Sequence, residues 1–409
     1  MIKFGKIDIS SLWWIFSLLS IYSAEILDKL NRSAGEGRVG AAIRIFLIMG
    51  SCLYIFLSTR KNVQEKSYLL FIMVLISISL GMIFTVIHYD FSLISSIYML
   101  VRYYAGLVFL ICSVITINNI KDRNVESSLK VIGLTFIFIF FVNIIFALYG
   151  YFFDLDIFKT YGYFLNQSNI DFYYDSRFGF NGFIVEQNIS SYFFFIGFVI
   201  LYFTYIKKRS KLYLPFYTFF VLIISLLTGT KTLFAMSLFF IFFIFVEKSI
   251  LRFLFLTLIS FLSIFYIVIK DKFDILTNFD FWNFVLSNRL GFVWERFFSG
   301  GYKIIIPNML FGTFYDDGSK FLVELEFVDL FNFLGLFGGV IYLFVVYLCV
   351  RASLSYLNYK NALSAIFIIL IACFFSGHLF YDPTSSFFFS YLILFIGLLG
   401  RKNELSKRF

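Results

Sequence analysis

Three arginines lie in the two longest segments that separate the apolar stretches of this chain: Arg177, Arg289 and Arg296. A planar guanidinium binds two phosphate oxygens at once and stays charged even beside lipid. Arg289 and Arg296 are seven residues apart, so they share one face if that segment is helical. The three residues predict either a site for a phosphorylated ligand or a set of charges that bind lipid headgroups.

Three further cations, Arg102, Arg44 and Lys231, lie within or beside the apolar stretches, where a charge is costly and usually functional. Arg102 stands roughly 12 Å into its stretch, too deep for its side chain to reach the boundary, so we expect it to face protein or water. Arg44 and Lys231 lie closer to a boundary that a long side chain can reach, which favours a positioning role for both. Glu25 is a candidate partner for one of these cations.

Four carboxylates stand where the apolar stretches meet the two long segments. They are Glu186, Glu324, Glu326 and Asp329. A carboxylate in such a place can deprotonate or orient a hydroxyl group. One that only pairs with Arg102 or Arg289 would look the same in the sequence, so both interpretations stay open.

The histidines and the candidate metal motif give little support to any particular enzyme class. His378, beside Tyr381 and Asp382, is a further candidate base, although a histidine at such a place more often caps a helix end. Asp154-Leu155-Asp156 has the spacing of a metal-binding pair of carboxylates, a motif short enough to recur by chance. The chain has no zinc-ligand spacing, no Walker loop and no GxSxG motif, so those enzyme classes receive no support and no cofactor is predicted.

The composition is that of a membrane protein. Of 409 residues, 60% are hydrophobic and 14% are charged, and the mean hydropathy is +0.88. The net charge of +9 would suggest a nucleic-acid partner in a soluble protein. Here the lysines and arginines form short runs between apolar stretches, which is typical of residues that orient helices in a membrane, so no nucleic acid is expected.

Apolar runs long enough to cross a bilayer predict twelve helices in a single transmembrane domain over 1–409. They lie near 10–26, 40–58, 67–87, 94–118, 130–153, 189–206, 212–228, 232–246, 251–269, 328–350, 362–380 and 383–400.

The connectors that hold most of the 34 Lys and Arg residues are short, and this clustering assigns them and both ends of the chain to the cytoplasm. The two long segments, 154–188 and 270–327, then lie outside. Because the cytoplasmic connectors are short and these two segments are long, we expect function to reside on the outer side. A reaction there has no ATP, so its substrate must carry its own leaving group, as a lipid pyrophosphate sugar does.

Five short motifs follow one another between residues 177 and 340. They are Arg177-Phe178-Gly179-Phe180, Thr228-Gly229-Thr230-Lys231-Thr232, Arg289 followed after ten residues by Gly300, Gly312-Thr313, and Gly335-Leu336-Phe337-Gly338. In this order the segment resembles the O-antigen polymerase and ligase superfamily, the Wzy-type polymerases of lipopolysaccharide and capsule assembly. With the same ten intervening residues after Arg177, the sequence has Asn188 where the second loop has Gly, so the first loop departs from that spacing.

The resemblance implies a fold like that of the GT-C-like membrane glycosyltransferases, in a bacterial inner membrane. It implies an inverting, metal-independent transfer of a growing glycan from undecaprenyl pyrophosphate to a lipid-linked repeat unit, with membrane lipids, a flippase and a chain-length regulator as further partners. The cations Arg177, Arg289 and Arg102 would neutralise the departing pyrophosphate, with Arg296 and Lys231 as further binding residues. The acceptor hydroxyl would be activated by one of three residues: Glu324, Glu326 or His378.

Two rival functions are an O-antigen ligase and a flippase or exporter of the same lipid-linked sugars. Ligases of the superfamily carry a histidine eleven positions before the closing Gly-x-x-Gly, where this chain has Glu324. A transporter should concentrate charge near the middle of the membrane, and the two long external segments argue against that.

Overall fold

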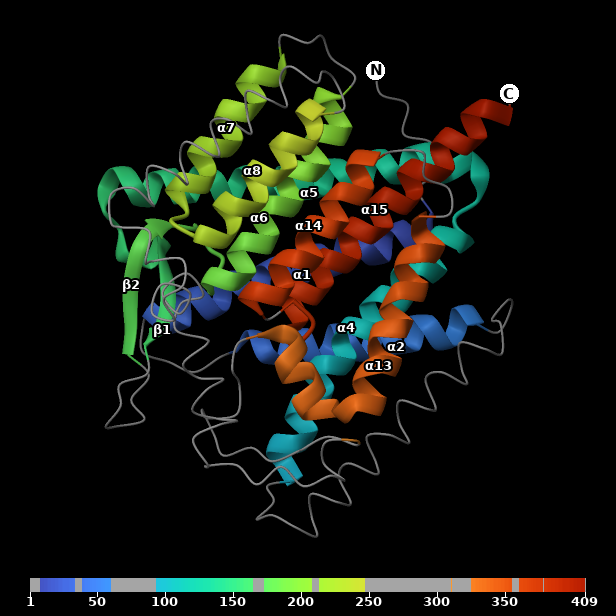
Figure 1. Ribbon diagram of the computed structural model, residues 1–409, viewed down its shortest axis with the longest axis horizontal. Helices are drawn as coiled ribbons and strands as arrows, with labels where there is room; N and C mark the ends of the chain where they lie inside the picture. The colour runs from blue at the N-terminus through green and yellow to red at the C-terminus, as the bar shows by residue number, and fades with distance from the viewer. Residues whose placement is uncertain are drawn as a thin grey trace, which may run out of the picture.

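The computed structural model describes the backbone of residues 8–33, 39–59, 93–164, 173–207, 213–246, 310, 325–354, 360–377 and 379–408. These residues are almost entirely helical (Figure 1). Long apolar runs favour this, because a helix satisfies its own backbone N–H and C=O groups where water is absent. The helices are α1 (Ile9–Ser33), α2 (Gly40–Thr59), α4 (Leu93–Asn119), α5 (Val125–Phe153), α6 (Gln187–Leu201), α7 (Tyr213–Leu227), α8 (Lys231–Val246), α13 (Glu326–Leu354), α14 (Lys360–Ser376) and α15 (Pro383–Arg408).

Ten of the twelve predicted spans fall on described residues, and all ten are helical. The spans near 67–87 and 251–269 lie outside the described residues. Within the described part, seven helices are long and apolar enough to cross a membrane, and α7, α8 and α14 are shorter apolar helices. This is the all-α bundle expected of a polytopic membrane protein, while the number of twelve spans stays a prediction.

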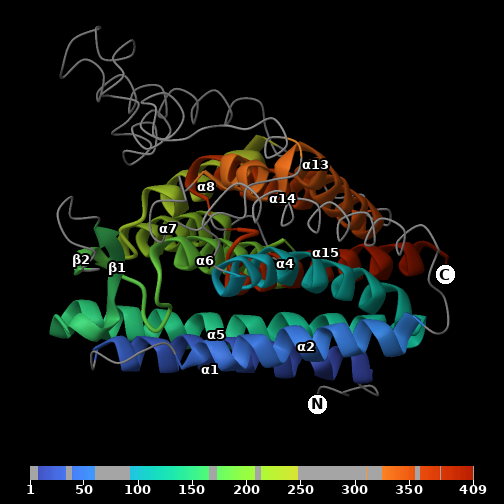
Figure 2. The ribbon, with the colours of Figure 1, turned by 90° about the horizontal axis from the view of Figure 1, so that it is seen from below.

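The helices form three layers when the molecule is seen from below (Figure 2). Helices α1, α2 and α5 lie along one side, α8, α13 and α14 lie along the opposite side, and α4, α6 and α15 lie between them. The apolar stretch of α15 is completely buried, whereas only 17% of the corresponding stretch of α2 is buried. Helix α15 is therefore the central helix, and α2 is peripheral, with large apolar side chains facing outward.

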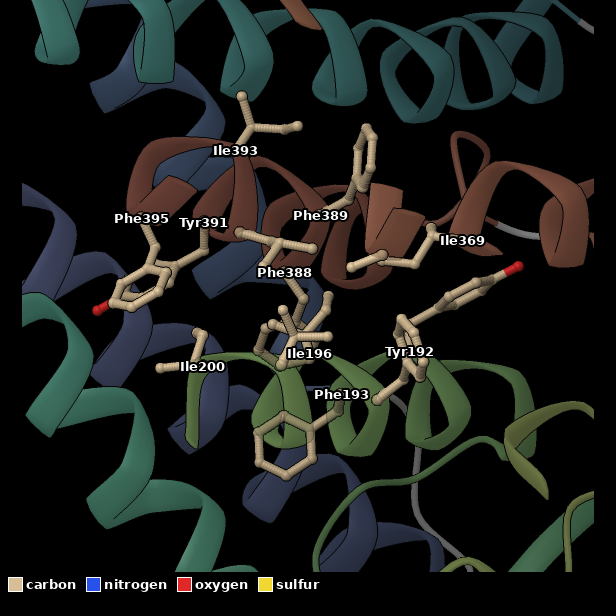
Figure 3. Packing of buried hydrophobic residues seen from close by; sticks show 14 of the residues in the cluster. Tyr192, Phe193, Ile196, Ile200, Ile369, Phe388, Phe389, Tyr391, Ile393 and Phe395 are labelled. Carbon is tan, nitrogen blue, oxygen red and sulfur yellow. The ribbon is translucent and has the colours of Figure 1, made fainter. Parts of the chain in front are cut away.

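The core is built from aromatic side chains between α15 and its neighbours (Figure 3). The rings of Phe193 on α6 and Phe388 on α15 have centroids 5.1 Å apart. The buried Tyr391 hydroxyl donates a hydrogen bond to the Ile132 carbonyl on α5 at 2.8 Å, so this polar group does not go unsatisfied. These contacts hold α15 between α5 and α6.

Polar contacts show which helix ends lie together. At one end of the bundle, Lys29 near the end of α1 donates hydrogen bonds to the carbonyls of Lys159 and Ile184, just before α6 begins. At the other end, Lys402 of α15 lies 2.6 Å from the carboxylate of Glu126 at the start of α5. The end of α1 therefore lies beside the start of α6, and the end of α15 lies beside the start of α5. The assignment of one end to the cytoplasm stays a prediction.

The segment between α5 and α6 contains a β-hairpin that the sequence analysis did not predict. Strand β1 (Lys159–Phe164) pairs with strand β2 (Tyr173–Phe180) in an antiparallel ladder. Both strands are rich in tyrosine and phenylalanine, which suit a pleated, half-covered surface. The predicted external loop 154–188 is therefore partly a sheet.

Helix α13 is broken at Gly335, the first glycine of the Gly-x-x-Gly motif. Gly335 has φ 70° and ψ 178°, a conformation that residues with a Cβ rarely adopt. The ring of Phe331 packs against Gly339 across the break, where a Cβ would come within 2.5 Å of the ring. We call the part before the break, 326–334, α13a. The part after it, 336–354, is roughly 28 Å long, enough to cross a bilayer. The apolar span predicted near 328–350 is therefore present, but it is not one continuous helix.

Candidate functional site

Helix α15 begins with a cap built from its own first residues. The Asp382 carboxylate accepts a hydrogen bond from the N–H of Ser385 at 2.7 Å, and the Asp382 carbonyl accepts one from Ser386 at 3.0 Å. Pro383 occupies the first helical position, where a missing N–H costs little. The cap fixes the segment 379–382, which joins α14 to α15 and carries Tyr381.

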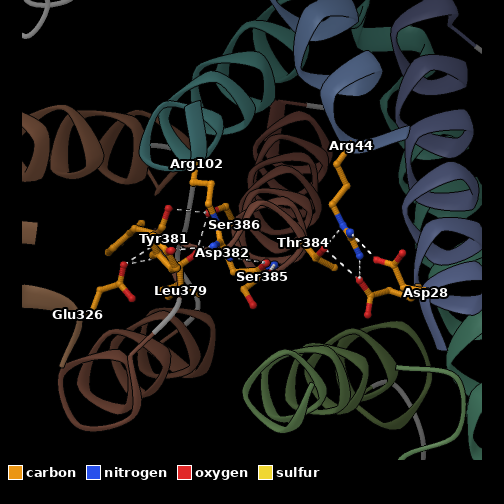
Figure 4. A network of polar contacts seen from close by, with 12 residues as sticks. Asp28, Arg44, Arg102, Glu326, Leu379, Tyr381, Asp382, Thr384, Ser385 and Ser386 are labelled. Carbon is orange, nitrogen blue, oxygen red and sulfur yellow. Dashed lines mark hydrogen bonds and ion pairs between the residues drawn. The ribbon is translucent and has the colours of Figure 1, made fainter. Parts of the chain in front are cut away.

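Arg102 of α4 lies against this segment (Figure 4). Its guanidinium carbon is 3.8 Å from the centroid of the Tyr381 ring, and its Nη1 donates a hydrogen bond to the Tyr381 hydroxyl at 2.6 Å. Its Nη2 lies 3.9 Å from the Asp382 carboxylate. The side chain is 15% exposed. Arg102 therefore faces protein, as its depth in the sequence predicts, but it is not completely enclosed.

Glu326 reaches the same segment from α13a. Its Oε1 accepts hydrogen bonds from the backbone N–H groups of Phe380 at 2.9 Å and of Tyr381 at 2.8 Å. Its other oxygen, Oε2, is buried and has no hydrogen-bond partner among the described residues. We call the group formed by Arg102, Glu326, Tyr381 and Asp382 the Arg102 cluster.

Other buried polar atoms near the Arg102 cluster also lack a hydrogen-bond partner within the described part of the chain. They are the hydroxyl of Tyr103, next to Arg102 on α4, and the hydroxyl of Ser385 on the first turn of α15. The Tyr103 ring packs edge-on against Tyr381, with centroids 5.5 Å apart. A region in which several buried polar groups are unsatisfied usually has a functional or solvent-related reason.

Arg44 of α2 belongs to a second group of charges. It pairs with Glu25 and, at 2.7 Å, with Asp28 of α1, and its Nε donates a hydrogen bond to the Thr384 hydroxyl at 2.9 Å. The predicted pairing of Glu25 with a cation is confirmed. Arg44 is thus fixed by two carboxylates of the neighbouring helix, and its side chain is 13% exposed, close to the value for Arg102.

Lys29, one residue after Asp28, completes this second group. It is 1% exposed. Its ammonium donates to the Lys159 carbonyl and to the Asn181 side-chain oxygen at 2.8 Å each, and to the Ile184 carbonyl at 3.0 Å. Lys29 therefore ties α1 to the hairpin and to the residues that lead into α6. We call Glu25, Asp28, Lys29 and Arg44 the α1 cluster.

The two clusters share one electrostatic environment. The pKa of the Asp382 carboxyl is raised to about 6, and burial is the largest cause. The carboxylates of Glu186, at the start of α6, and of Glu25 also raise this pKa, whereas Arg102 and Arg44 lower it. The starts of α6 and α15 therefore lie close enough for their acidic residues to influence each other.

The remaining sequence predictions divide into two sets. Lys231 is the first residue of α8 and is exposed, as expected for a cation near a boundary. The backbone of Arg177 lies in β2, opposite Thr160 of β1. The other predicted site residues lie outside the described residues, and their roles stay predictions. They are Arg289, Arg296, Glu324 and His378.

Two of the family-like motifs meet in space. Gly179, from the first motif, packs against the Thr228 carbonyl in the second, and a Cβ on Gly179 would come within 2.4 Å of that oxygen. The Thr160 hydroxyl donates a hydrogen bond to the same carbonyl at 3.0 Å. The hairpin is thereby fixed to the turn between α7 and α8, next to Lys231.

The two carboxylates of the Asp154-Leu155-Asp156 motif pair with a neighbouring lysine in the structure. Both carboxylates are 81% exposed and pair with Lys159, at 3.0 Å and 2.7 Å. Across the described residues, no group of three or more His, Cys, Asp or Glu side chains is placed to hold a metal ion.

The sequence analysis missed Lys29 and Asp28, although a signal was present. Glu25, Asp28 and Lys29 fall within about one helical turn of an otherwise apolar stretch, and a transmembrane stretch rarely tolerates that without internal partners. Asn143 was also missed. It is buried on α5 and bonds the backbone of Asn181 and of Phe183, so it helps Lys29 to hold the same loop.

Comparisons with known proteins give no relative for this chain. No family model, no curated protein and no solved structure matches it.

Proposed function

We propose that this chain polymerises undecaprenyl-pyrophosphate-linked oligosaccharide repeat units into O-antigen or capsular polysaccharide, on the periplasmic side of a bacterial inner membrane. The proposal starts from the resemblance of segment 177–340 to Wzy-type polymerases. The observation that carries it further is the guanidinium of Arg102, stacked on Tyr381 and 15% exposed at the end of the bundle where α15 begins.

A stacked, hydrogen-bonded arginine suits the main electrostatic demand of this reaction. Negative charge develops on the pyrophosphate as it leaves the sugar, and a cation already fixed in a poorly solvated place stabilises that charge without first having to reorganise. The ring of Tyr381 fixes the plane of the guanidinium, and a planar fork binds phosphate oxygens in pairs.

The proposed step is an inverting displacement. A hydroxyl of the incoming lipid-linked repeat unit attacks the anomeric carbon of the growing chain, the bond to the pyrophosphate oxygen breaks, and undecaprenyl pyrophosphate leaves. The hydroxyl proton passes to a base. We assign Arg102, Arg177 and Arg289 to the pyrophosphate, Arg296 and Lys231 to further substrate contacts, and the acceptor proton to one of two residues, Glu324 or His378.

The position of the charges favours this function over export of the same lipids. The Arg102 cluster and the α1 cluster both lie where α6 and α15 begin, and the contacts of Lys29 place the hairpin beside them. A transporter should instead gather its charged residues near the middle of the bundle.

A deletion strain tests the proposal. We expect cells without this protein to keep single repeat units, both on the carrier lipid and on the acceptor core, and to lose all longer chains on a glycan gel. Reintroduction of the gene should restore the ladder. A ladder that persists in the deletion strain would reject the proposal. Loss of the core-linked single unit would support a ligase or flippase instead.

A further inference from the structure

Glu326 contacts backbone far along the chain and, through it, the candidate phosphate-binding arginine. Its Oε1 accepts the N–H groups of Phe380 and Tyr381 at 2.9 Å and 2.8 Å. The hydroxyl of Tyr381 in turn accepts a hydrogen bond from Arg102 at 2.6 Å. One chain of contacts therefore runs from α13a through segment 379–382 to the guanidinium.

The placement of Glu326 does not suit a general base. A base must come within hydrogen-bond distance of the acceptor hydroxyl. Glu326 is 1% exposed, and one of its carboxylate oxygens is already occupied by two N–H donors. Its other carboxylate oxygen has no hydrogen-bond partner among the described residues, so no described lysine or arginine donates to it.

We infer that Glu326 is a positioning residue: α13a clamps segment 379–382 through Glu326 and thereby holds the Arg102 guanidinium in the orientation that binds phosphate groups of the substrate. The choice of ligand rests on the proposed function. The clamp itself rests only on the contacts.

The break at Gly335 is what allows α13a to reach this segment. Because the chain changes direction there, the first turn of α13 lies against the backbone of residues 380 and 381 while the part after the break continues through the bundle. The ring of Phe331, before the break, packs against Gly339, after the break, and holds the two parts of α13 together. The family-like glycine motif would then serve to position a carboxylate.

Two substitutions separate positioning from base catalysis. Glu326→Gln keeps an oxygen that accepts both N–H groups but cannot take up a proton, whereas Glu326→Ala removes the acceptor. In membranes with matched protein amounts, we expect Glu326→Gln to make chains of nearly normal length. Glu326→Ala should lower the polymerisation rate by up to about 100-fold, because a displacement of about 1 Å in a reacting group has that effect.

Glu126→Ala is the matched control, since Glu126 also lies on the first turn of its helix but is exposed at the opposite end of the bundle. It should leave chain length unchanged. Only single repeat units from Glu326→Gln at normal abundance would identify Glu326 as a base and overturn the inference.

A stability measurement tests whether Glu326 and Arg102 act through the same segment, 379–382, even if the chain proves not to be a polymerase. In detergent, we expect Glu326→Ala and Arg102→Ala each to lower Tm. The double variant should lose clearly less than the sum of the two losses, because both substitutions release the same segment. Additive losses would show that Glu326 and Arg102 act independently and would reject the clamp.

Discussion

The α1 cluster and the Arg102 cluster lie on neighbouring sides of the start of α15, yet the protein satisfies their buried polar groups to different degrees. In the α1 cluster, each charged group has close polar partners: Arg44 has two carboxylates and Lys29 has three oxygen acceptors. Around the Arg102 cluster, three buried polar atoms have no hydrogen-bond partner among the described residues: Oε2 of Glu326 and the hydroxyls of Tyr103 and Ser385.

This difference indicates a structural role for the α1 cluster and a functional role for the Arg102 cluster. Buried charges that are fully satisfied by the protein hold helices in place and leave nothing to bind a ligand. Buried polar groups that lack a protein partner usually have a functional reason or bind water. The α1 cluster should therefore determine whether the protein folds, and the Arg102 cluster should determine what it does once folded.

The largest expected effect is on folding, from Lys29→Met. The substitution keeps an apolar stem but leaves the Lys159 and Ile184 carbonyls and the Asn181 side chain without their donor. Breaking a buried charged network costs about 3 to 5 kcal/mol. We expect little folded protein, measured as membrane abundance and Tm in detergent. Lys130→Met, an exposed change on α5, is the control, and a normal Tm for Lys29→Met would contradict the structural role of the α1 cluster.

In contrast to Lys29→Met, Arg102→Lys should lower activity and leave protein abundance unchanged. An ammonium keeps the positive charge but loses the flat stacking on Tyr381 and the paired donors, so transition-state stabilisation should fall by about 2 to 4 kcal/mol. We expect normal abundance together with single repeat units on a glycan gel. Normal chains from this variant would remove Arg102 from the substrate site.

Gly335→Ala tests the break in α13. An alanine at φ 70° and ψ 178° should cost about 2 kcal/mol of stability. The relaxed helix should also pull α13a away from segment 379–382, so that activity falls together with Tm. Val340→Ala, an exposed change on the same helix, should leave both unchanged. An unaltered Tm for Gly335→Ala would show that the break is not needed.

The smallest expected effect concerns pH and Asp382. Its pKa is about 6 in the fold and about 3.9 in an unfolded chain, so the folded state binds the proton more tightly. The stability gained from that proton is present at low pH and is lost as the pH rises through 6. Asp382→Asn still caps α15 but cannot ionise. Between pH 5 and pH 7.5, we expect its advantage over the natural protein to grow by about 1 kcal/mol. A constant difference in Tm across this range would contradict the raised pKa.

Much of the helical framework could be predicted because a long apolar run leaves the backbone few alternatives to a helix. That Arg102 faces protein followed from its place in an apolar stretch, and the pairing of Glu25 followed from the cost of an isolated buried charge. These are local properties, readable from a single stretch of sequence.

The parts that could not be predicted depend on distant segments or on single dihedral angles. Glu326 has the same sequence pattern whether it acts as a base or as an anchor, and the contacts that favour an anchor involve the backbone of Phe380 and Tyr381, more than fifty residues away. The break at Gly335 lies inside a continuous apolar run, so hydropathy does not reveal it. The hairpin depends on the pairing of two segments, 159–164 and 173–180, which neither segment reveals alone.

The central place of α15 has a consequence for how the protein is made. Every other described helix precedes α15 in the chain, so α15 leaves the ribosome after all of them. Until it arrives, Arg44 lacks its contact with Thr384, Arg102 lacks its contact with Asp382, and Glu126 lacks Lys402. The contacts of α15 with the earlier helices can therefore form only after those helices have been made, so the core around α15 is completed late in synthesis.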